Sequence, residues 1–214
     1  MRIPKRDVTV LIISLLCALM LNPLSISAQH SAEKRTNVAL EYGAHRLGRR
    51  TDEQMQKWRD CGLGQFIHWG VFAIAGGQWN GENYRGAAEF LRTWGKVPKE
   101  AYDNLYKQFN PTDFDAKVWA KQAKDMGAKY MIITTKHHDG FCLWPSKYTD
   151  YTIANTPYKK DIIGELVKAY DEQGIDVYLY FSVIDWNYYG YRSSVKTEQD
   201  KKEYEEFKTF TRNQ

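Results

Sequence analysis

Two adjacent histidines, an aspartate and a tryptophan directly follow a run of apolar and β-branched residues. The run is Tyr130–Thr135, and the polar segment after it is Lys136–Trp144, with the sequence KHHDGFCLW. A short apolar, β-branched run of this kind is typical of a buried strand. The polar segment therefore begins at the carboxyl end of a strand, which is where α/β barrels bind their ligands.

The histidine pair suits recognition of hydroxyl groups better than coordination of a shared metal ion. Side chains of adjacent strand residues point to opposite faces, so His137 and His138 would not naturally ligate one metal. Where the backbone turns at a strand end, both can approach one ligand, and a neutral imidazole offers one donor and one acceptor. The structural alternative is one satisfied core histidine and one that faces solvent.

Two other expected strand ends carry similar groups. His68 and Trp69 end the expected strand 64–69, and Tyr180 lies within the expected strand 175–184. Flat apolar faces are available from Trp79, Tyr84, Trp94, Trp144 and Trp186. Such faces combined with hydroxyl-binding groups are what a sugar ring requires, although core packing explains each tryptophan singly at least as well.

The elements that must position these residues alternate between helix and strand. Residues 116–126 carry apolar side chains at helical spacing, with Asp113 available as a cap and Gly127 as the stop. The same pattern recurs over 162–170, and a last helix is expected over 198–211. Alternating strands and helices predict a parallel sheet with right-handed crossovers.

The predicted fold is the N-terminal portion of a (β/α)8 TIM-like barrel. About three strands are expected among the 214 residues, giving three to four βα units, whereas a whole barrel needs about 250 residues. An open parallel sheet is the alternative, although its exposed edge would invite association. The aromatic segment 76–112 is expected to be a long loop that helps to build the site.

The N-terminus has the layout of a secretory signal. Basic residues precede an apolar stretch at 8–21, and small residues follow, with cleavage expected after Ala28. A membrane anchor is the alternative, but the apolar stretch is shorter than the roughly 20 residues that span a bilayer. The predicted domains are a signal peptide at 1–28, a lead-in at 29–57 and an incomplete catalytic barrel at 58–214.

Composition and charge indicate a globular protein without a polyanionic partner. The chain is 43% hydrophobic and 14% aromatic, and its formal net charge is +4. Charges of both signs are interspersed, so no nucleic-acid partner is implied. Cys61 and Cys142, which follow the signal, have no spacing typical of a disulfide framework or a metal site and are read as small buried residues.

Taken in order, the motifs resemble the α-L-fucosidases of glycoside hydrolase family twenty-nine. They span most of the chain after the lead-in: FIHWGVF at 66–72, FNPTDFDA at 109–116, WA at 119–120, GAKY at 127–130, TTKHHDGFCLW at 134–144, SKYTDY at 146–151 and DW at 185–186. Each motif by itself is weak evidence for the family. The complete set in this order is highly specific for it.

The resemblance implies hydrolysis of terminal α-linked L-fucose from glycans with retention of configuration, through a covalent fucosyl-enzyme. It implies a substrate-binding set of histidines, aromatic residues and one glutamate: His68, Trp69, Glu89, His137, His138, Tyr180 and Trp186. Many relatives carry tryptophan where this chain has Phe90, so apolar stacking is kept and the indole donor is lost. A solvent-exposed helix glutamate is the alternative reading of Glu89.

Retention requires two carboxyl groups about 5 to 5.5 Å apart. By the same resemblance, both the nucleophile and the acid/base residue are expected beyond Gln214, so no catalytic residue, metal or cofactor is predicted here. Asp139 and Asp185 stand at strand ends, but the resemblance assigns the first to a structural turn and places the second after the third strand. The chain alone is expected not to hydrolyse an aryl fucoside.

The expected protein is exported to a bacterial periplasm or the cell exterior, acts on a fucosylated glycan, and has no membrane span once the signal is cleaved. Two other classes stay open. One is a fucose-binding fragment that performs no chemistry. The other is a metal-dependent barrel hydrolase.

Overall fold

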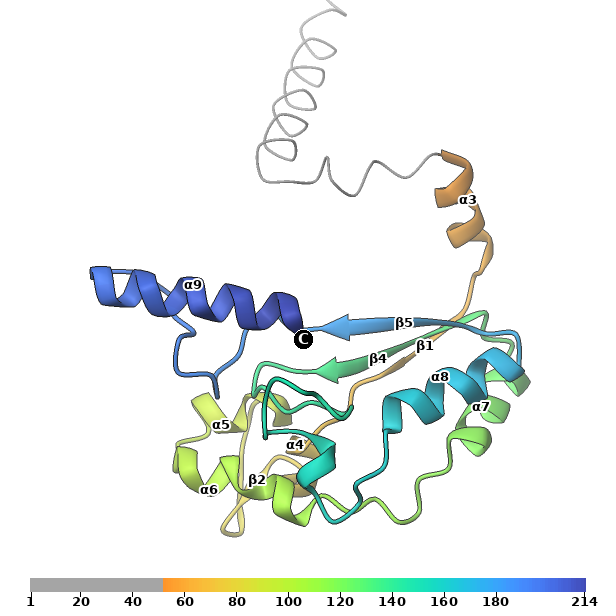
Figure 1. The fold of residues 1–214 in the computed structure, drawn as a ribbon. Coiled ribbons are helices and arrows are strands. Elements are labelled where there is room, and N and C mark those ends of the chain that lie inside the picture. The colour runs from red at the N-terminus through yellow and green to blue at the C-terminus, as the bar shows by residue number, and fades with distance from the viewer. Residues whose placement is uncertain (1–51) are drawn as a thin grey trace, which may run out of the picture. The chain divides into compact units, whose positions relative to one another are not determined.

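A computed structural model describes residues 52–214 (Figure 1). The predicted signal peptide, residues 1–28, and most of the lead-in at 29–57 lie outside the described residues, and both stay predictions. The described part begins with helix α3, Asp52–Asp60. Among residues 52–214, no helix has the length and apolar character needed to cross a membrane.

Three parallel strands form the central sheet. They are β1 (Gly64–Ile67), β4 (Tyr130–Lys136) and β5 (Asp176–Phe181), in the order β1-β4-β5. The register pairs Gly64 with Tyr130 and Tyr130 with Asp176, so the carboxyl ends of all three strands meet at one edge. The parallel βα arrangement is confirmed. Among the described residues the sheet is open, and no closed barrel is seen.

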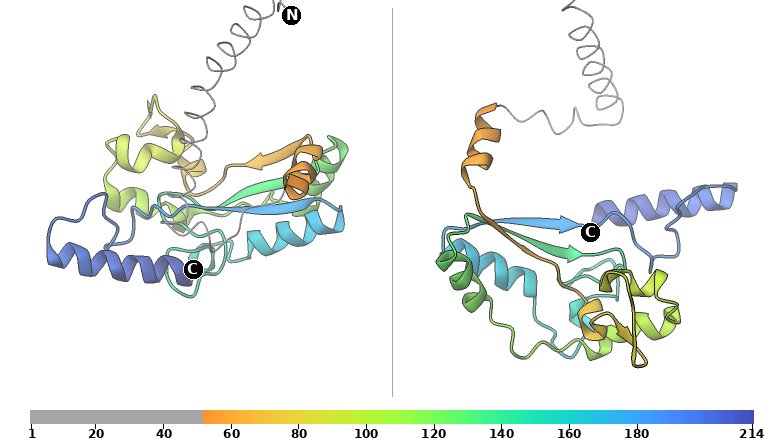
Figure 2. Two further views of the ribbon diagram at one scale, coloured as in Figure 1. Left: turned by 90° about the horizontal axis from the view of Figure 1, so that it is seen from above. Right: turned by 180° about the vertical axis from the view of Figure 1, so that it is seen from behind.

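Helices α7 (Ala116–Asp125) and α8 (Ile162–Glu172) contact each other and cover one face of this sheet (Figures 1 and 2). They end before Gly127 and Gly174, whose φ angles of 82° and 69° lie in the left-handed region. Both glycine stops agree with the prediction.

The cap of α7 was predicted at the wrong residue. Asp115, not Asp113, accepts hydrogen bonds from the backbone N–H groups of Lys117 (2.8 Å) and Val118 (3.1 Å). Only a residue immediately before the first helical turn can reach these groups, and α7 begins at Ala116.

The core lies between the sheet and these helices. It is built from small residues of α7 and larger apolar residues of α8 and β4: Ala116, Ala120, Ala123, Met131, Ile133, Ile162, Leu166 and Tyr170. Alanines let α7 approach its neighbours closely, while β4 is the central strand and is buried along most of its length.

The segment predicted as a long loop is instead folded into short elements. Helix α4 (Phe72–Ala75) precedes this segment, which contains β2 (Gln78–Trp79), β3 (Glu82–Asn83), η2 (Ala88–Phe90), α5 (Leu91–Trp94), α6 (Lys99–Asp103) and η3 (Leu105–Gln108). A pair of hydrogen bonds from the buried Arg92 guanidinium to the Asp103 carboxylate, 2.5 and 2.7 Å long, ties α5 to α6. This ion pair fixes two of the short elements, α5 and α6, relative to each other.

Two further elements complete the described chain. The short helix η4 covers Ile153–Asn155, and α9 covers Glu198–Asn213, two residues longer than predicted. A reciprocal capping box between Thr197 and Asp200 starts α9. The last turn of α9 returns to the carboxyl end of β5 (Figure 2).

Candidate functional site

Three histidines meet where β1 and β4 end. The ring centroids of His68 and His137 are 4.8 Å apart, and those of His137 and His138 are 4.2 Å apart. Strand β4 ends at Lys136 with an irregularity in its register against β5, so the alternation of side chains no longer applies to the next two residues. The prediction that both histidines of the pair turn toward one place therefore agrees with the structure.

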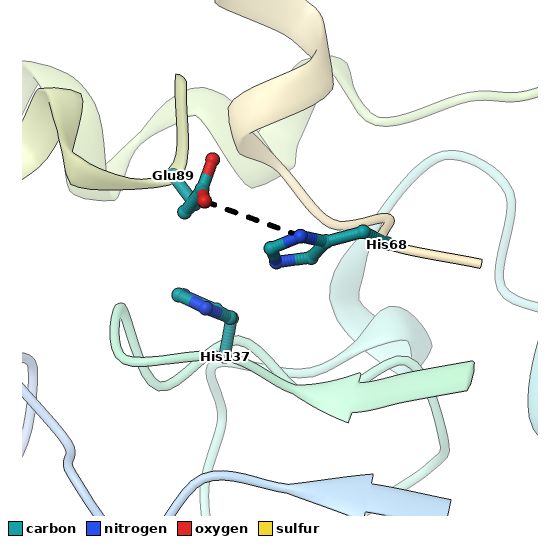
Figure 3. Close-up of side chains that lie close together, drawn as sticks. All are labelled: His68, Glu89 and His137. Carbon is teal, nitrogen blue, oxygen red and sulfur yellow. Dashed lines mark ion pairs between the residues drawn. The ribbon is translucent and has the colours of Figure 1, made fainter. Parts of the chain in front are cut away.

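Glu89 joins this cluster from η2, far from the sheet in sequence. Its Oε1 lies 4.0 Å from His68 Nδ1, and its side chain is 17% exposed (Figure 3). The alternative of a freely solvated helix glutamate does not agree with this position. Polar atoms of His68, Glu89 and His137 all lie within 4.8 Å of one another, so these three residues could also hold a metal ion.

Aromatic rings surround the histidines. Tyr180 lies nearly parallel to His137, with centroids 6.2 Å apart, and Trp186 meets His138 edge-on at 5.2 Å. Phe90 approaches His138 to 5.7 Å and Trp186 to 5.8 Å. The phenyl ring thus occupies the apolar position that we expected for it.

The sequence reading missed the stack of Phe90 on Trp94. Their rings are 4.2 Å apart and inclined by only 8°, and Trp94 is 62% exposed. The spacing of four residues in a helical segment was the signal that could have revealed it. This stack extends the apolar surface of the site toward solvent.

The structure does not bring Trp69 to the cluster, which corrects its place in the predicted site. Its ring packs against three aromatic side chains of the core, Phe109, Phe114 and Trp119, with centroids 5.2 to 5.5 Å away. Trp69 follows His68 directly, and adjacent extended residues point to opposite sides. Its backbone instead fixes the strand end, since its N–H donates to Thr134 Oγ1 (2.9 Å) and its carbonyl accepts from that hydroxyl (2.8 Å).

Burial keeps the histidine pair neutral. Desolvation, with smaller contributions from the nearby His138 and His68, lowers the pKa of His137 to about 3. Desolvation also lowers the pKa of His138, whose Nδ1 lies 2.7 Å from the Ser182 hydroxyl. Among the described residues, the buried His137 Nδ1 has no hydrogen-bond partner. A neutral imidazole with an unused nitrogen is suited to a polar ligand.

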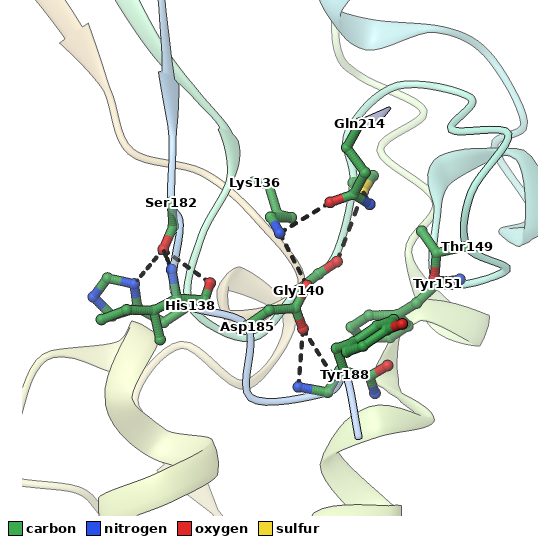
Figure 4. A network of polar contacts seen from close by, with 12 residues as sticks. Lys136, His138, Gly140, Thr149, Tyr151, Ser182, Asp185, Tyr188 and Gln214 are labelled. Carbon is green, nitrogen blue, oxygen red and sulfur yellow. Dashed lines mark hydrogen bonds and ion pairs between the residues drawn. The ribbon is translucent and has the colours of Figure 1, made fainter. Parts of the chain in front are cut away.

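A buried ion pair joins the ends of β4 and β5 next to the histidines. Lys136 Nζ lies 2.9 Å from Asp185 Oδ2, both side chains are almost wholly buried, and Gln214 Oε1 accepts from the same ammonium at 3.0 Å (Figure 4). Asp185 Oδ1 accepts from the N–H groups of Asn187 and Tyr188, which fixes the turn after β5. The neighbouring Trp186 N–H donates to the His138 carbonyl at 2.7 Å.

Asp185 caps the segment that follows β5, while the side chain that contacts His138 is that of Ser182. The Asp185 carboxylate packs closely against the backbone of Gly140. A Cβ at this position would lie 2.3 Å from Asp185 Oδ1, and the φ of 87° also favours glycine. Asp185 is therefore committed to structural contacts on both oxygens.

Asp139 is equally committed. Its oxygens accept from the Phe141 N–H (3.1 Å) and the Tyr102 hydroxyl (3.0 Å). Burial raises the pKa of this carboxyl to about 6. Both contacts are internal, so Asp139 holds the turn after β4 and links it to α6. Cys142, in the same turn, is fully buried, whereas Cys61 is partly exposed.

The fold and the site together are typical of an α/β enzyme that binds a carbohydrate. Parallel βα units with a cluster of polar side chains at their carboxyl edge are the arrangement of α/β enzymes, and neutral imidazoles among flat rings suit a carbohydrate. The chain belongs to the Alpha-L-fucosidase family, whose family model matches residues 28–214.

Solved relatives agree with this assignment. The chain is similar to a family 29 α-L-fucosidase from Bacteroides thetaiotaomicron, with 61% identity and a TM-score of 0.74, over 78% of this chain and 38% of that one. A further crystal structure from that organism, with the same identity, is described as a trapped covalent intermediate in complex with 2-fluoro-fucosyl fluoride. The Arabidopsis thaliana protein named alpha-L-fucosidase 1 is 34% identical over 135 residues, which are 62% of this chain and 23% of that protein. The chain thus spans well under half the length of these relatives.

Proposed function

We propose that this chain is the fucose-binding N-terminal part of an exported, retaining α-L-fucosidase that removes terminal α-linked L-fucose from glycans. The observation that carries the proposal is the convergence of His68, Glu89 and His137 at one edge of the sheet, beside His138 and the aromatic rings. Membership of the family supports the same substrate class.

The site is suited to recognition of a sugar ring. Neutral imidazoles both donate to and accept from hydroxyl groups, and the Glu89 carboxylate accepts two more hydrogen bonds. Tyr180 and Trp186 bring further polar and apolar groups beside the histidines. A deoxysugar such as fucose presents both hydroxyl groups and a methyl group, so it uses both kinds of contact.

The chemistry itself needs two carboxyl groups. A retaining glycosidase places them about 5 to 5.5 Å apart, one as nucleophile and one as acid/base. Among the described residues, Glu89 lies at the histidines, while Asp139 and Asp185 are engaged internally. In our proposal the nucleophile and the acid/base residue come from sequence that the relatives carry and these 214 residues do not include.

Export remains part of the proposal. It rests on the basic, apolar and small-residue pattern of residues 1–28, and the periplasm or the cell exterior is where such a glycosidase meets fucosylated glycans.

Calorimetry of the full chain with L-fucose tests the binding role. We expect saturable binding of L-fucose, no response to L-rhamnose, and at least a tenfold loss of affinity in His68→Ala. The matched control is Lys121→Ala, an exposed substitution on α7, which should leave binding unchanged. Equal affinity in wild-type chain and His68→Ala would refute the assignment of the site.

An assay with an aryl α-L-fucoside separates catalysis from binding. The chain alone should show no turnover, which fits both a fragment of an enzyme and a non-catalytic sugar-binding protein. A longer chain that includes the sequence seen in the relatives should turn over the substrate. Turnover by the 214 residues alone, abolished in Asp185→Asn, would overturn our placement of the catalytic carboxylates.

A further inference from the structure

Two imidazoles and one carboxylate meet here from three separate segments of the chain. His68 follows β1, His137 follows β4, and Glu89 belongs to η2. Their polar atoms lie within 4.8 Å of one another, and Figure 3 shows the two rings and the carboxylate turned toward a common space. His137 and His138 are adjacent and do not share an ion in this arrangement, whereas His137 lies beside His68, which follows the neighbouring strand.

This donor set is one that zinc prefers. Two histidines and one glutamate, with a fourth position left to a water or ligand, form a recognised tetrahedral zinc set. Ligand atoms at about 2.0 to 2.2 Å from zinc are about 3.3 Å apart, so the cluster must contract by roughly 1 Å or more at its widest separation.

The side chains that have to move are the less buried ones. His68 is 35% exposed and Glu89 is 17% exposed, and the latter has three rotatable side-chain bonds. His137 is the buried, fixed member, and its Nδ1 has no hydrogen-bond partner in the described part of the chain. Binding of an ion would therefore require rotation of the His68 and Glu89 side chains toward His137.

We infer that His68, Glu89 and His137 bind a divalent transition-metal ion of the zinc type, and that this ion and the sugar exclude each other. Exclusion follows because the same three groups are assigned to the fucose hydroxyls. The metal-binding half of the inference stands on geometry alone. The exclusion half rests on the proposed function.

His138 provides the sharpest control. It lies 4.2 Å from His137 by ring centroid, yet its Nδ1 is engaged by Ser182 and it is outside the three-ligand set. The chain also contains His30 and His45, outside the described residues, and their double replacement by alanine controls for binding there.

The test is calorimetry with Zn²⁺ on the full chain, with Co²⁺ absorption reporting the coordination geometry. We expect one Zn²⁺ per chain, a tetrahedral Co²⁺ spectrum, and affinity at least about tenfold weaker in His68→Ala and Glu89→Gln. Glu89→Gln keeps the shape of the side chain and is therefore not expected to perturb the fold. Near-ultraviolet circular dichroism shows whether His68→Ala does so, and if it does, the result for Glu89→Gln still tests the ligand set. His138→Gln and the His30/His45 variant should bind Zn²⁺ as the wild-type chain does.

Loss of Zn²⁺ binding in the His30/His45 variant, or an equal loss in His138→Gln and Glu89→Gln, would overturn the assigned ligand set. Saturating L-fucose should weaken the apparent Zn²⁺ affinity. If Zn²⁺ binds through the three residues and L-fucose does not affect it, metal binding is upheld and exclusion fails. If L-fucose binds and Zn²⁺ does not, the metal site fails while the sugar site stands.

Discussion

Neutral, poorly solvated imidazoles are the distinguishing residue-scale feature of this site. His137 is 6% exposed and lies among the rings of His68, Phe72 and His138. Burial disfavours its charged form, so the neutral form dominates at physiological pH. This state is useful for binding hydroxyl groups, and it has a measurable consequence for stability.

We predict an acid-dependent loss of stability that His137 carries. Its pKa is about 3 in the folded chain and about 6.5 when unfolded, so the unfolded state binds more protons between these values. This contribution is complete above about pH 6.5 and is lost on acidification, amounting to about 2 kcal/mol between pH 7 and pH 5. Urea unfolding of wild-type chain and His137→Asn at both pH values measures it.

The difference between the wild-type chain and His137→Asn reports the contribution of His137 to the pH dependence of stability. The buried Asp139, whose pKa is raised to about 6, acts in the opposite direction, because its folded form keeps a proton that the unfolded form loses. That contribution is present in both chains and cancels in the difference. If the free energy of unfolding changes equally with pH in both, His137 does not carry the effect.

At the scale of elements, the carboxyl edge is held together by polar contacts between segments that are distant in sequence. Lys136 ends β4, Asp185 follows β5, and their ion pair joins residues 49 positions apart. The ammonium also lies 4.5 Å from the centroid of the Phe181 ring. The pair therefore sets where the β4 turn and the β5 turn meet, and with them His138 and Trp186.

We predict that Lys136→Met destabilises the chain by about 3 to 5 kcal/mol, because it leaves the Asp185 carboxylate buried without its counter-ion. The matched control is Lys121→Met. It breaks a pair of similar length, Lys121 with Asp125, whose side chains are 70% and 60% exposed, and should cost less than about 1 kcal/mol. Chemical unfolding followed by circular dichroism measures both.

A second substitution distinguishes lost charge pairing from lost packing. In Lys136→Met/Asp185→Asn, the amide oxygen keeps the caps to Asn187 and Tyr188 while the buried charge is removed. We expect much of the stability to return. A double variant as unstable as Lys136→Met would show that packing of the lysine side chain, and not its charge, is what matters.

At the scale of the whole molecule, the open sheet is the main feature. Within residues 52–214, β5 pairs only with β4, and three of its large hydrophobic residues, Tyr178, Leu179 and Tyr180, are exposed. A groove of about 830 Å³ runs between β5 and α8, lined by residues that include Ile163, Val167, Leu179 and Phe181. It lies along the edge strand, away from the histidines.

We predict that the 214-residue chain self-associates through this edge. Unpaired strand edges with apolar side chains recruit other strands, and a lysine placed on them prevents this. Leu179→Lys should therefore shift sedimentation toward the monomer. Val118→Lys is the control, since Val118 is comparably exposed on α7 and should not alter association. Identical sedimentation of wild type and Leu179→Lys would contradict the prediction.

Features that depend on interactions between neighbouring residues could be predicted from the sequence. The parallel order of strands and helices, the glycine stops and the position of both histidines after β4 follow from periodicity and local hydrogen bonding, which act over a few residues. The ordered motifs also determined the family, because they record many such local constraints together. The cap at Asp115 was missed by two positions, within the usual uncertainty of helix ends.

Which of these residues contact one another became known only from the folded chain. It brought Glu89 to His68, turned Trp69 into the core and stacked Phe90 on Trp94 beside the site. It also joined Lys136 to Asp185. These outcomes depend on packing between segments that are remote along the chain, and the short elements of residues 72–108 have too little periodicity to reveal their final position.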